Sequence, residues 1–272
     1  MILYVFNPEA KNAKRLKGKI KSYLAHLDLN GEFVEAKQKE DVANIAQEAL
    51  DRDIDTIVAI GGDGIVNRII QVIAGKDITL GVIPIGETNL LAKFLKINNW
   101  RKGCEVLVKK EIINLNLGLV NDKKYFISSV EVESEEEKTR NFFKKIVSRK
   151  KEKKYTNAII NIENINSNLK MQTEVSSIMI SSMPFPLPEN IDLQEIMEKE
   201  ELSIITKSKP QGKNKTSEEI TVLAGRKIDI SSKQKMDVKI DGENFGKTNV
   251  SIEILPKALR VITPKRKEIQ KI

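Results

Sequence analysis

The 272-residue sequence has very little of several residue types that common functional sites require. It contains one cysteine, Cys104, and one histidine, His26. A single cysteine excludes an internal disulfide, and the pair excludes a Cys/His zinc cluster and a two-histidine metal motif. We therefore interpret Cys104 and His26 as structural residues and expect a reducing, cytoplasmic compartment.

The sequence also lacks a long apolar run. No stretch approaches the roughly 18 residues that a membrane-spanning helix needs, and the apolar start precedes any positive charge, the reverse of a signal peptide. With 40% hydrophobic and 31% charged residues, the composition is that of a soluble globular protein. The 272 residues are more than one hydrophobic core usually serves, so we expect two domains.

Basic residues outnumber acidic ones, 46 to 38, which gives a net charge of +8. This surplus suggests phosphate, nucleic acid or an anionic membrane as a partner, although lysines scattered over the surface for solubility would explain it equally well. Only 5% of the residues are aromatic and no motif that reads nucleic acid is present, so we expect no nucleic-acid partner.

Residues 1–112 alternate between strand and helix patterns. The runs 2–6, 57–60 and 80–83 are apolar without alternation, which is typical of strands buried on both faces. Apolar residues at helical spacing lie between and after them, namely Leu16, Ile20, Tyr23, Leu24 and Leu27, then Val42, Ile45, Ala46 and Ala49, then Val66, Ile69, Ile70 and Ile73. The pattern predicts an α/β domain with a parallel sheet.

Residues 113–272 have a different pattern. Alternation at period two over 113–117, 175–180 and 236–240 predicts an antiparallel, sandwich-like β-domain. We expect loops at 184–188 and 207–216, a charged helical insert at 134–154, and a last strand at 258–262 that can return to the first domain.

The most informative segment is the glycine-rich turn 61–64, Gly-Gly-Asp-Gly, after the apolar run 57–60. Glycines let the backbone approach a ligand, and a helix beginning near Gly64 would present free N–H groups to an anion. Asp63 would repel phosphate unless a divalent cation lay between them, which points to Mg²⁺ with a phosphate ester. The alternative is a tight strand-to-helix turn with no ligand.

A second glycine turn, Gly86 to Asn89, follows the apolar run 80–83. Turns at the carboxyl ends of neighbouring parallel strands share one edge, so both turns can flank one crevice.

Two other glycine segments are poor candidates for a ligand site. Residues 62–67 lack the third glycine of a dinucleotide fingerprint, and residues 242–248 resemble a Walker loop but lie between two predicted strands, as a hairpin connection would.

Together these motifs resemble the diacylglycerol kinase catalytic family, which includes bacterial lipid kinases and sphingosine kinases and is related to NAD kinases. The resemblance rests on Asn7-Pro8, on Gly-Gly-Asp-Gly at 61–64 with Asn67, on Pro84-x-Gly86-x-x-Asn89, on Asp241-Gly242-Glu243, and on the run from Leu255 to Pro264. It implies a Rossmann-like nucleotide-binding domain over 1–112, a β-sandwich-like domain over 113–272, and an active site in a cleft between them.

The resemblance also implies roles for single residues. ATP would contact the backbone of Gly61, Gly62 and Gly64 and the side chains of Asn7, Asn67, Thr88 and Asn89. Asp63 would act on the side of Mg²⁺, with Glu200 as a substitute for the second metal ligand, and Glu243 would be the general base that accepts the proton of the acceptor hydroxyl. A purely structural Asp-Gly hairpin at 241–242 remains the alternative.

The sequence departs from the family pattern in the stretch 9–14, where the family has small residues and glycine, and at several single positions. Ile65 stands where the family usually has threonine, Arg68 replaces glutamate, Glu87 replaces threonine and Asn116 replaces aspartate. Glu87 would place negative charge beside phosphates. One hypothesis is that Arg68 and Lys93 compensate for it; the alternative is that both are solvent-exposed helix residues.

The leading function is an Mg²⁺- and ATP-dependent lipid kinase of phospholipid metabolism that phosphorylates diacylglycerol or a related lipid. The alternatives are a kinase with another acceptor and a catalytically weak protein that binds nucleotide or lipid in a regulatory role. Residues 142–154 combine aromatic and basic residues, so this segment could hold a cytoplasmic enzyme at an anionic membrane, although a solvated helix explains it too. The pattern leaves the oligomeric state open.

Overall fold

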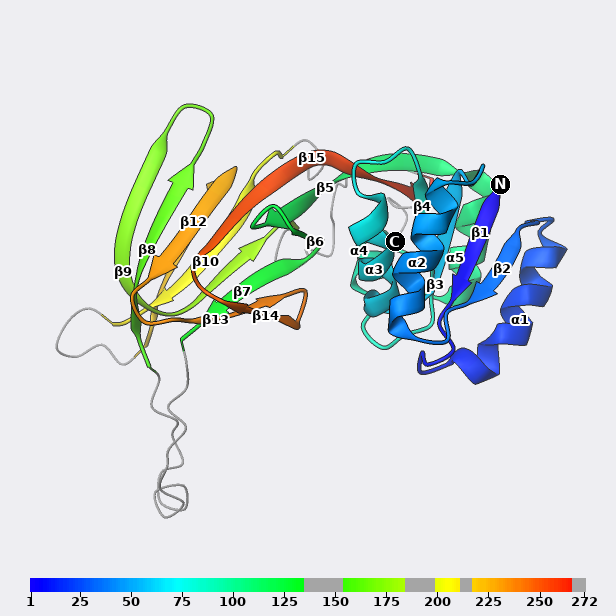
Figure 1. The fold of residues 1–272 in the computed structure, drawn as a ribbon, viewed down its shortest axis with the longest axis horizontal. Helices are drawn as coiled ribbons and strands as arrows, with labels where there is room; N and C mark the ends of the chain where they lie inside the picture. The colour runs from blue at the N-terminus through cyan, green and yellow to red at the C-terminus, as the bar shows by residue number, and fades with distance from the viewer. Residues whose placement is uncertain (135–153, 184–198, 211–216, 266–272) are drawn as a thin grey trace, which may run out of the picture. The chain divides into compact units, whose positions relative to one another are not determined.

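The computed structural model describes residues 1–134, 154–183, 199–210 and 217–265, and divides the chain into two compact units (Figure 1). Unit 1 contains Met1–Leu117 and the described part of Leu255–Ile272, and unit 2 contains the described residues between Gly118 and Ile254. Unit 1 is α/β and unit 2 is built from antiparallel strands, so the predicted fold class is confirmed. Most of the predicted helical insert and the loop at 184–188 lie outside the described residues.

Unit 1 has a parallel sheet with the strand order β15-β4-β3-β1-β2. The strands are β1 (Ile2–Phe6), β2 (Glu32–Glu35), β3 (Thr56–Gly61), β4 (Thr79–Pro84) and the end of β15 (Val250–Thr263). β1 and β3 are buried along their whole length, which explains why these runs are apolar without alternation.

Among the described residues, five helices accompany this sheet: α1 (Ala13–His26), α2 (Lys39–Leu50), α3 (Asp63–Ile73), α4 (Leu90–Phe94) and α5 (Trp100–Lys109). The side chains predicted to form helical stripes are mostly buried, with Leu16, Ile20 and Leu24 on α1 and Ile69, Ile70 and Ile73 on α3. α2 packs against α3, and α1 packs against α5. No helix among the described residues is long and apolar enough to cross a bilayer.

Unit 2 has two sets of paired strands that share β9 (Asn168–Ser181). One has the order β14-β13-β7-β9-β10-β11 and the other β12-β8-β9, with the first residues of β15 beside β12. The remaining bounds are β5 (Glu111–Val120), β6 (Lys124–Phe126), β7 (Ser129–Glu133), β8 (Thr156–Glu163), β10 (Leu202–Ser208), β11 (Glu219–Gly225), β12 (Lys227–Ser232), β13 (Asp237–Ile240) and β14 (Glu243–Lys247).

The core of unit 2 is made of aliphatic side chains that alternate with exposed ones along these strands. Two predictions about its loops are wrong. Lys207 and Ser208 end β10 because they pair with β9 and β11, so the loop begins later. Residues 243–247 form β14 itself, and the hairpin connection is only Asp241 and Gly242.

Asn116 shows how one family departure is accommodated within unit 1. Its side chain is buried, and its Oδ1 accepts a hydrogen bond from the backbone N–H of Lys257 at 2.9 Å. Lys257 has a φ of 55°, in the left-handed region, where β15 turns. An amide oxygen accepts this hydrogen bond as a carboxylate would, so asparagine in place of aspartate keeps the contact.

We therefore expect Asn116→Ala to lower the free energy of unfolding by about 1–3 kcal/mol, because it leaves the Lys257 N–H without its acceptor. Asn114→Ala is the matched control, since Asn114 is an exposed asparagine of the same strand, and a change of at most about 0.5 kcal/mol is expected. Urea unfolding followed by the fluorescence of Trp100, the single tryptophan, measures both. Equal stabilities of the two variants would contradict this role.

Candidate active site

The candidate site lies at the carboxyl-terminal edge of the parallel sheet of unit 1. The chain moves from β1 outward to β2 and then returns past β1 to β3 and β4, so the order of the strands reverses between β1 and β3. Ligands of open α/β sheets bind outside the carboxyl ends of the strands at such a switch point. The loops that follow β1 and β3 contain Asn7 and the Gly61–Gly64 turn, and the Gly86 loop follows the adjacent strand β4.

The turn after β3 brings the amino terminus of α3 to this edge. Gly62 is the N-cap residue in an extended conformation, and α3 begins at Asp63, one residue before the predicted start. A Cβ atom on Gly61 would lie 2.6 Å from Ile65 Cγ2 and 3.2 Å from Asn7 Cβ, so only glycine fits there. The N–H groups of the first turn of an α-helix have no partner within the helix, which suits an anion.

The Gly61 and Gly86 loops are in direct backbone contact. The N–H groups of Ile85 and Gly86 both donate to the carbonyl oxygen of Gly61, at 3.0 and 3.2 Å. A Cβ atom on Gly86 would lie only 2.5 Å from the Cα of Gly62. Gly62 and Gly86, which lie in the turns that the sequence suggests for a ligand, are thus also needed because the two loops approach each other this closely.

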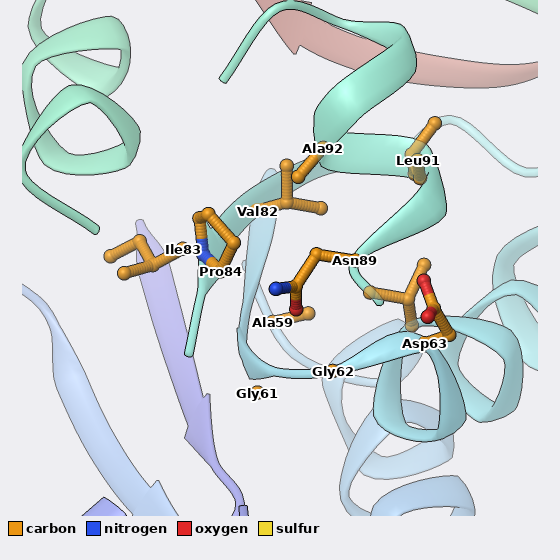
Figure 2. Close-up of a pocket in the computed structure, with 11 residues that line it drawn as sticks. Ala59, Gly61, Gly62, Asp63, Val82, Ile83, Pro84, Asn89, Leu91 and Ala92 are labelled. Atoms are coloured by element: carbon orange, nitrogen blue, oxygen red, sulfur yellow. The ribbon is translucent and has the colours of Figure 1, made fainter. Parts of the chain in front are cut away.

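Asn89 closes the second loop on itself. It has a φ of 51°, its Oδ1 accepts from the Gly86 N–H at 3.1 Å, and its Nδ2 donates to the Gly86 carbonyl oxygen at 2.9 Å. Figure 2 shows its side chain pointing into a small pocket lined partly by Gly61, Gly62 and Asp63. This pocket has room for about one water molecule. The Asn89 amide therefore shapes the loop, and its contact with the nucleotide stays a prediction.

Asp63 joins the two loops through its carboxylate. Its Oδ1 accepts a hydrogen bond from the N–H of Leu90, the first residue of α4, at 2.6 Å. Burial raises the pKa of Asp63 above its ordinary value, while the backbone amides of Leu90 and Asn89 act in the opposite direction. The carboxylate thus caps the start of α4.

The other predicted nucleotide contacts are spread along this edge. Asn7 is half-buried, and its Oδ1 accepts from the Glu9 N–H at 2.9 Å, which shapes the turn after β1. Asn67 is half-buried on α3, and Thr88 is exposed. The loops of Asn7, Thr88 and Asn89 thus follow β1 and β4, on either side of β3, and their direct contact with ATP stays a prediction.

The residues at the family departures have partners that the sequence did not reveal. Glu87 forms an ion pair with Lys11, with 2.7 Å between Oε1 and Nζ, and Arg68 donates to the Gly64 carbonyl oxygen at 2.9 Å. The direct partner of Glu87 is thus Lys11, and our hypothesis that Arg68 and Lys93 compensate for Glu87 stays a prediction. Ile65 is 2% exposed, so at this position the structure has a core side chain beside Gly61.

In unit 2, Asp241 and Gly242 form the tight turn between β13 and β14. Their φ values of 47° and 81° are those of a type I′ turn. The Asp241 carboxylate accepts three backbone hydrogen bonds, from Ile127 at 3.1 Å, Ser128 at 2.9 Å and Ser129 at 3.0 Å. Burial raises the pKa of Asp241, and these amides oppose the increase. Glu243 follows as the exposed first residue of β14, so the turn holds its backbone in a fixed position.

The predicted magnesium ligands each have a protein partner. Glu200 is paired with Arg226 in unit 2, and one oxygen of Asp63 is committed to Leu90. Throughout the residues that the structure describes, no three acidic, cysteine or histidine side chains are grouped as metal ligands. Asp63 lies in unit 1 and Glu200 in unit 2, so their shared role as Mg²⁺ ligands stays a prediction and we derive no step through such an ion.

Comparison with known proteins decides the family. The sequence matches the model of the diacylglycerol kinase catalytic domain over residues 1–120, and that of the YegS C-terminal NAD kinase beta sandwich-like domain over residues 193–263. The chain belongs to the diacylglycerol kinase catalytic domain family. The family predicted from the motifs is thereby confirmed.

Individual relatives agree with this assignment. A protein of Streptococcus pneumoniae serotype 4 named "Putative lipid kinase" is 26% identical, covering 98% of this chain and 99% of the relative. One of the same description from Staphylococcus haemolyticus is 27% identical over 78% of this chain and 77% of its own length. A solved structure titled "A putative diacylglycerol kinase from Bacillus anthracis str. Sterne" has a TM-score of 0.75 at 19% identity, over 97% of both chains, and so has the same fold. The chain is thus a member of a lipid kinase family.

The sequence did not indicate the contacts of two residues, Lys11 and Asp241. Lys11 lies in a segment where the family expectation is small residues and glycine, so no motif marks it. Asp241 is part of the Asp-Gly-Glu motif, but nothing local in the sequence indicates that its partners are the amides of Ile127 to Ser129, more than 110 residues earlier.

The loop contact makes a prediction about glycine substitutions. We expect Gly86→Ala to lower the free energy of unfolding by about 1–3 kcal/mol, because its Cβ would press on the Gly62 backbone. Gly64→Ala is the control, since its Cβ meets only the end of the flexible Arg68 side chain, at 3.3 Å, and a change within about 1 kcal/mol is expected. Urea unfolding followed by Trp100 fluorescence measures both. If Gly86→Ala were as stable as Gly64→Ala, the two loops would not be in contact as described.

Proposed function

We propose that the protein is an ATP-dependent lipid kinase that transfers a phosphoryl group to the hydroxyl of diacylglycerol or a related lipid. The observation that carries the proposal is the Gly61–Gly64 turn: it lies at the switch point of the sheet, contains the amino terminus of α3, and belongs to a chain of a lipid kinase family. These are the features that bind a polyphosphate.

The proposed reaction needs a hydroxyl held in line with the γ-phosphate and a group that accepts its proton. The hydroxyl oxygen forms a bond to the γ-phosphorus while the bond to the bridging oxygen breaks, and ADP leaves. The proton of the hydroxyl passes to the Glu243 carboxylate, which we propose as the general base. Support for Glu243 comes from its exposure and from the turn before it, which Asp241 holds rigidly.

In this proposal Asp63 is a positioning residue and not a direct metal ligand. Its hydrogen bond to Leu90 fixes the start of α4 against the start of α3. Magnesium would then come with the nucleotide, because Mg²⁺ commonly binds through substrate phosphates and water with few protein oxygens. The proposed location is cytoplasmic, and contact with an anionic membrane through residues 142–154 stays a prediction.

The proposal is tested by incubating the purified protein with Mg²⁺ and ATP labelled on the γ-phosphate, with vesicles that contain diacylglycerol, monoacylglycerol or ceramide. We expect the label in a lipid phosphate, with diacylglycerol as the leading acceptor. Bound ATP without any labelled lipid would instead favour the regulatory alternative. Label in another acceptor would reject diacylglycerol and keep the kinase.

The assignment of Glu243 gives a separate prediction. Glu243→Gln removes the basic oxygen but keeps the size, so we expect kcat to fall by about 10²–10⁴-fold, with ATP affinity changed by less than about twofold. Glu163→Gln is the control, because Glu163 is an exposed glutamate of the same unit, and its kcat should equal that of the unaltered protein. A Glu243→Gln variant with normal turnover would show that another group accepts the proton.

A further inference from the structure

The ion pair between Lys11 and Glu87 crosses the candidate site. Lys11 lies in the connection between β1 and α1, and Glu87 in the connection between β4 and α4. β3 lies between β1 and β4 in the sheet, so a contact between their loops must pass the carboxyl end of β3, where the Gly61–Gly64 turn begins. A second contact joins the same loops, since Asn12 Nδ2 donates to the Ile85 carbonyl oxygen at 3.4 Å.

The pair is of a kind that a ligand can separate. The side chain of Lys11 is 63% exposed and that of Glu87 is 70% exposed. Ion pairs in contact with water are weak and screened by salt. Lys11 carries its ammonium on a flexible stem of four carbons, which lets the charge move without moving the backbone.

The charges at this edge make Lys11 a phosphate-binding group. Glu87 carries a negative charge at neutral pH as any exposed glutamate does, and Lys11 holds its pKa below the usual range. Two other cations of this unit already bind protein oxygens: Arg15 of α1 donates to Asn12 Oδ1 at 3.1 Å, and Arg68 of α3 donates to the Gly64 carbonyl oxygen at 2.9 Å. A triphosphate at the Gly61–Gly64 turn brings more negative charge than one carboxylate, so it competes successfully for the Lys11 ammonium.

We propose that Lys11 is a phosphate-binding residue of the nucleotide site and that Glu87 competes for it, so that a bound triphosphate takes the Lys11 ammonium from the Glu87 carboxylate. This inference rests on the proposed function, because it requires a nucleotide at the Gly61–Gly64 turn. It assigns a role to Glu87, which the family pattern does not explain: the carboxylate weakens binding of any anion that is too weakly charged to displace it. Inorganic phosphate and AMP are therefore disfavoured relative to ATP.

The experiment is calorimetric titration with inorganic tripolyphosphate, and separately with ATP, at two salt concentrations. We expect Lys11→Gln to raise the Kd for tripolyphosphate about tenfold and to reduce its dependence on salt. Lys11→Arg should keep the Kd within about threefold because the charge remains. Glu87→Gln should lower the Kd by about threefold to tenfold, since it releases Lys11 and removes a repelling charge.

Lys19→Gln is the matched control, because Lys19 is an exposed lysine of α1 beyond the helix start, and its Kd should be unchanged. All variants should unfold at the same temperature within a few degrees, since the substituted side chains are exposed. The inference is overturned if Lys11→Gln binds tripolyphosphate as the unaltered protein does, if Glu87→Gln binds it more weakly, or if the unaltered protein does not bind it.

The lipid assay separates this inference from the proposed function. Tripolyphosphate binding that depends on Lys11, without transfer to any lipid, would reject the lipid kinase and support the role of Lys11. Transfer to lipid with the same KM for ATP in Lys11→Gln would reject the role of Lys11 and support the kinase.

Discussion

The close approach of Gly62 and Gly86 is the constraint on which the candidate site depends. With a side chain at Gly86 only 2.5 Å from the Gly62 backbone, the loops after β3 and β4 could not meet. Their contact is then fixed from both sides, by the Gly61 carbonyl oxygen, which accepts two N–H groups, and by Asp63, which accepts the N–H of Leu90. The beginnings of α3 and α4 therefore have a defined relative position before any ligand binds, which is the preorganisation that phosphate binding favours.

This contact changes what the glycine motif means chemically. A glycine-rich turn beside a strand is usually explained by the need for a ligand to approach the backbone. Here Gly61 and Gly86 are already required by protein atoms, whereas Gly64 faces only the Arg68 side chain. The part of the motif left for a ligand is thus the start of α3 near Gly64, on the side of the sheet where the strand order reverses. The Gly61–Gly64 motif thus combines a structural demand at Gly61 with a functional demand at the start of α3, and Gly86 meets a structural demand in the next loop.

The limits of sequence reasoning follow from the same contacts. Buried parallel strands such as 57–60 and the placement of two turns on one edge were predictable, because both follow from local apolar runs and from the geometry of parallel sheets. β2 was not, since Glu32–Glu35 is a short edge strand that begins and ends with glutamate. The partners of Asp63, Glu87 and Asn116 lie 27, 76 and 141 residues away, and nothing local in the sequence specifies such pairs. Residue types predicted the chemistry of the site, and only the fold shows which groups already have partners.

Asp63 and Asp241 show one physical principle in both units. Burial raises the pKa of each carboxyl, and each is bound by backbone amides, so both serve to fix the loops beside them. The carboxylates to which we assign chemistry are instead exposed ones, Glu243 after the Asp241 turn and Glu87 beside Lys11. Such a division is expected on energetic grounds, because a buried carboxylate that accepts several amide hydrogen bonds cannot exchange them for a substrate without leaving those amides unsatisfied. A carboxylate that does not hold several buried amides can accept a proton or release a lysine without this cost.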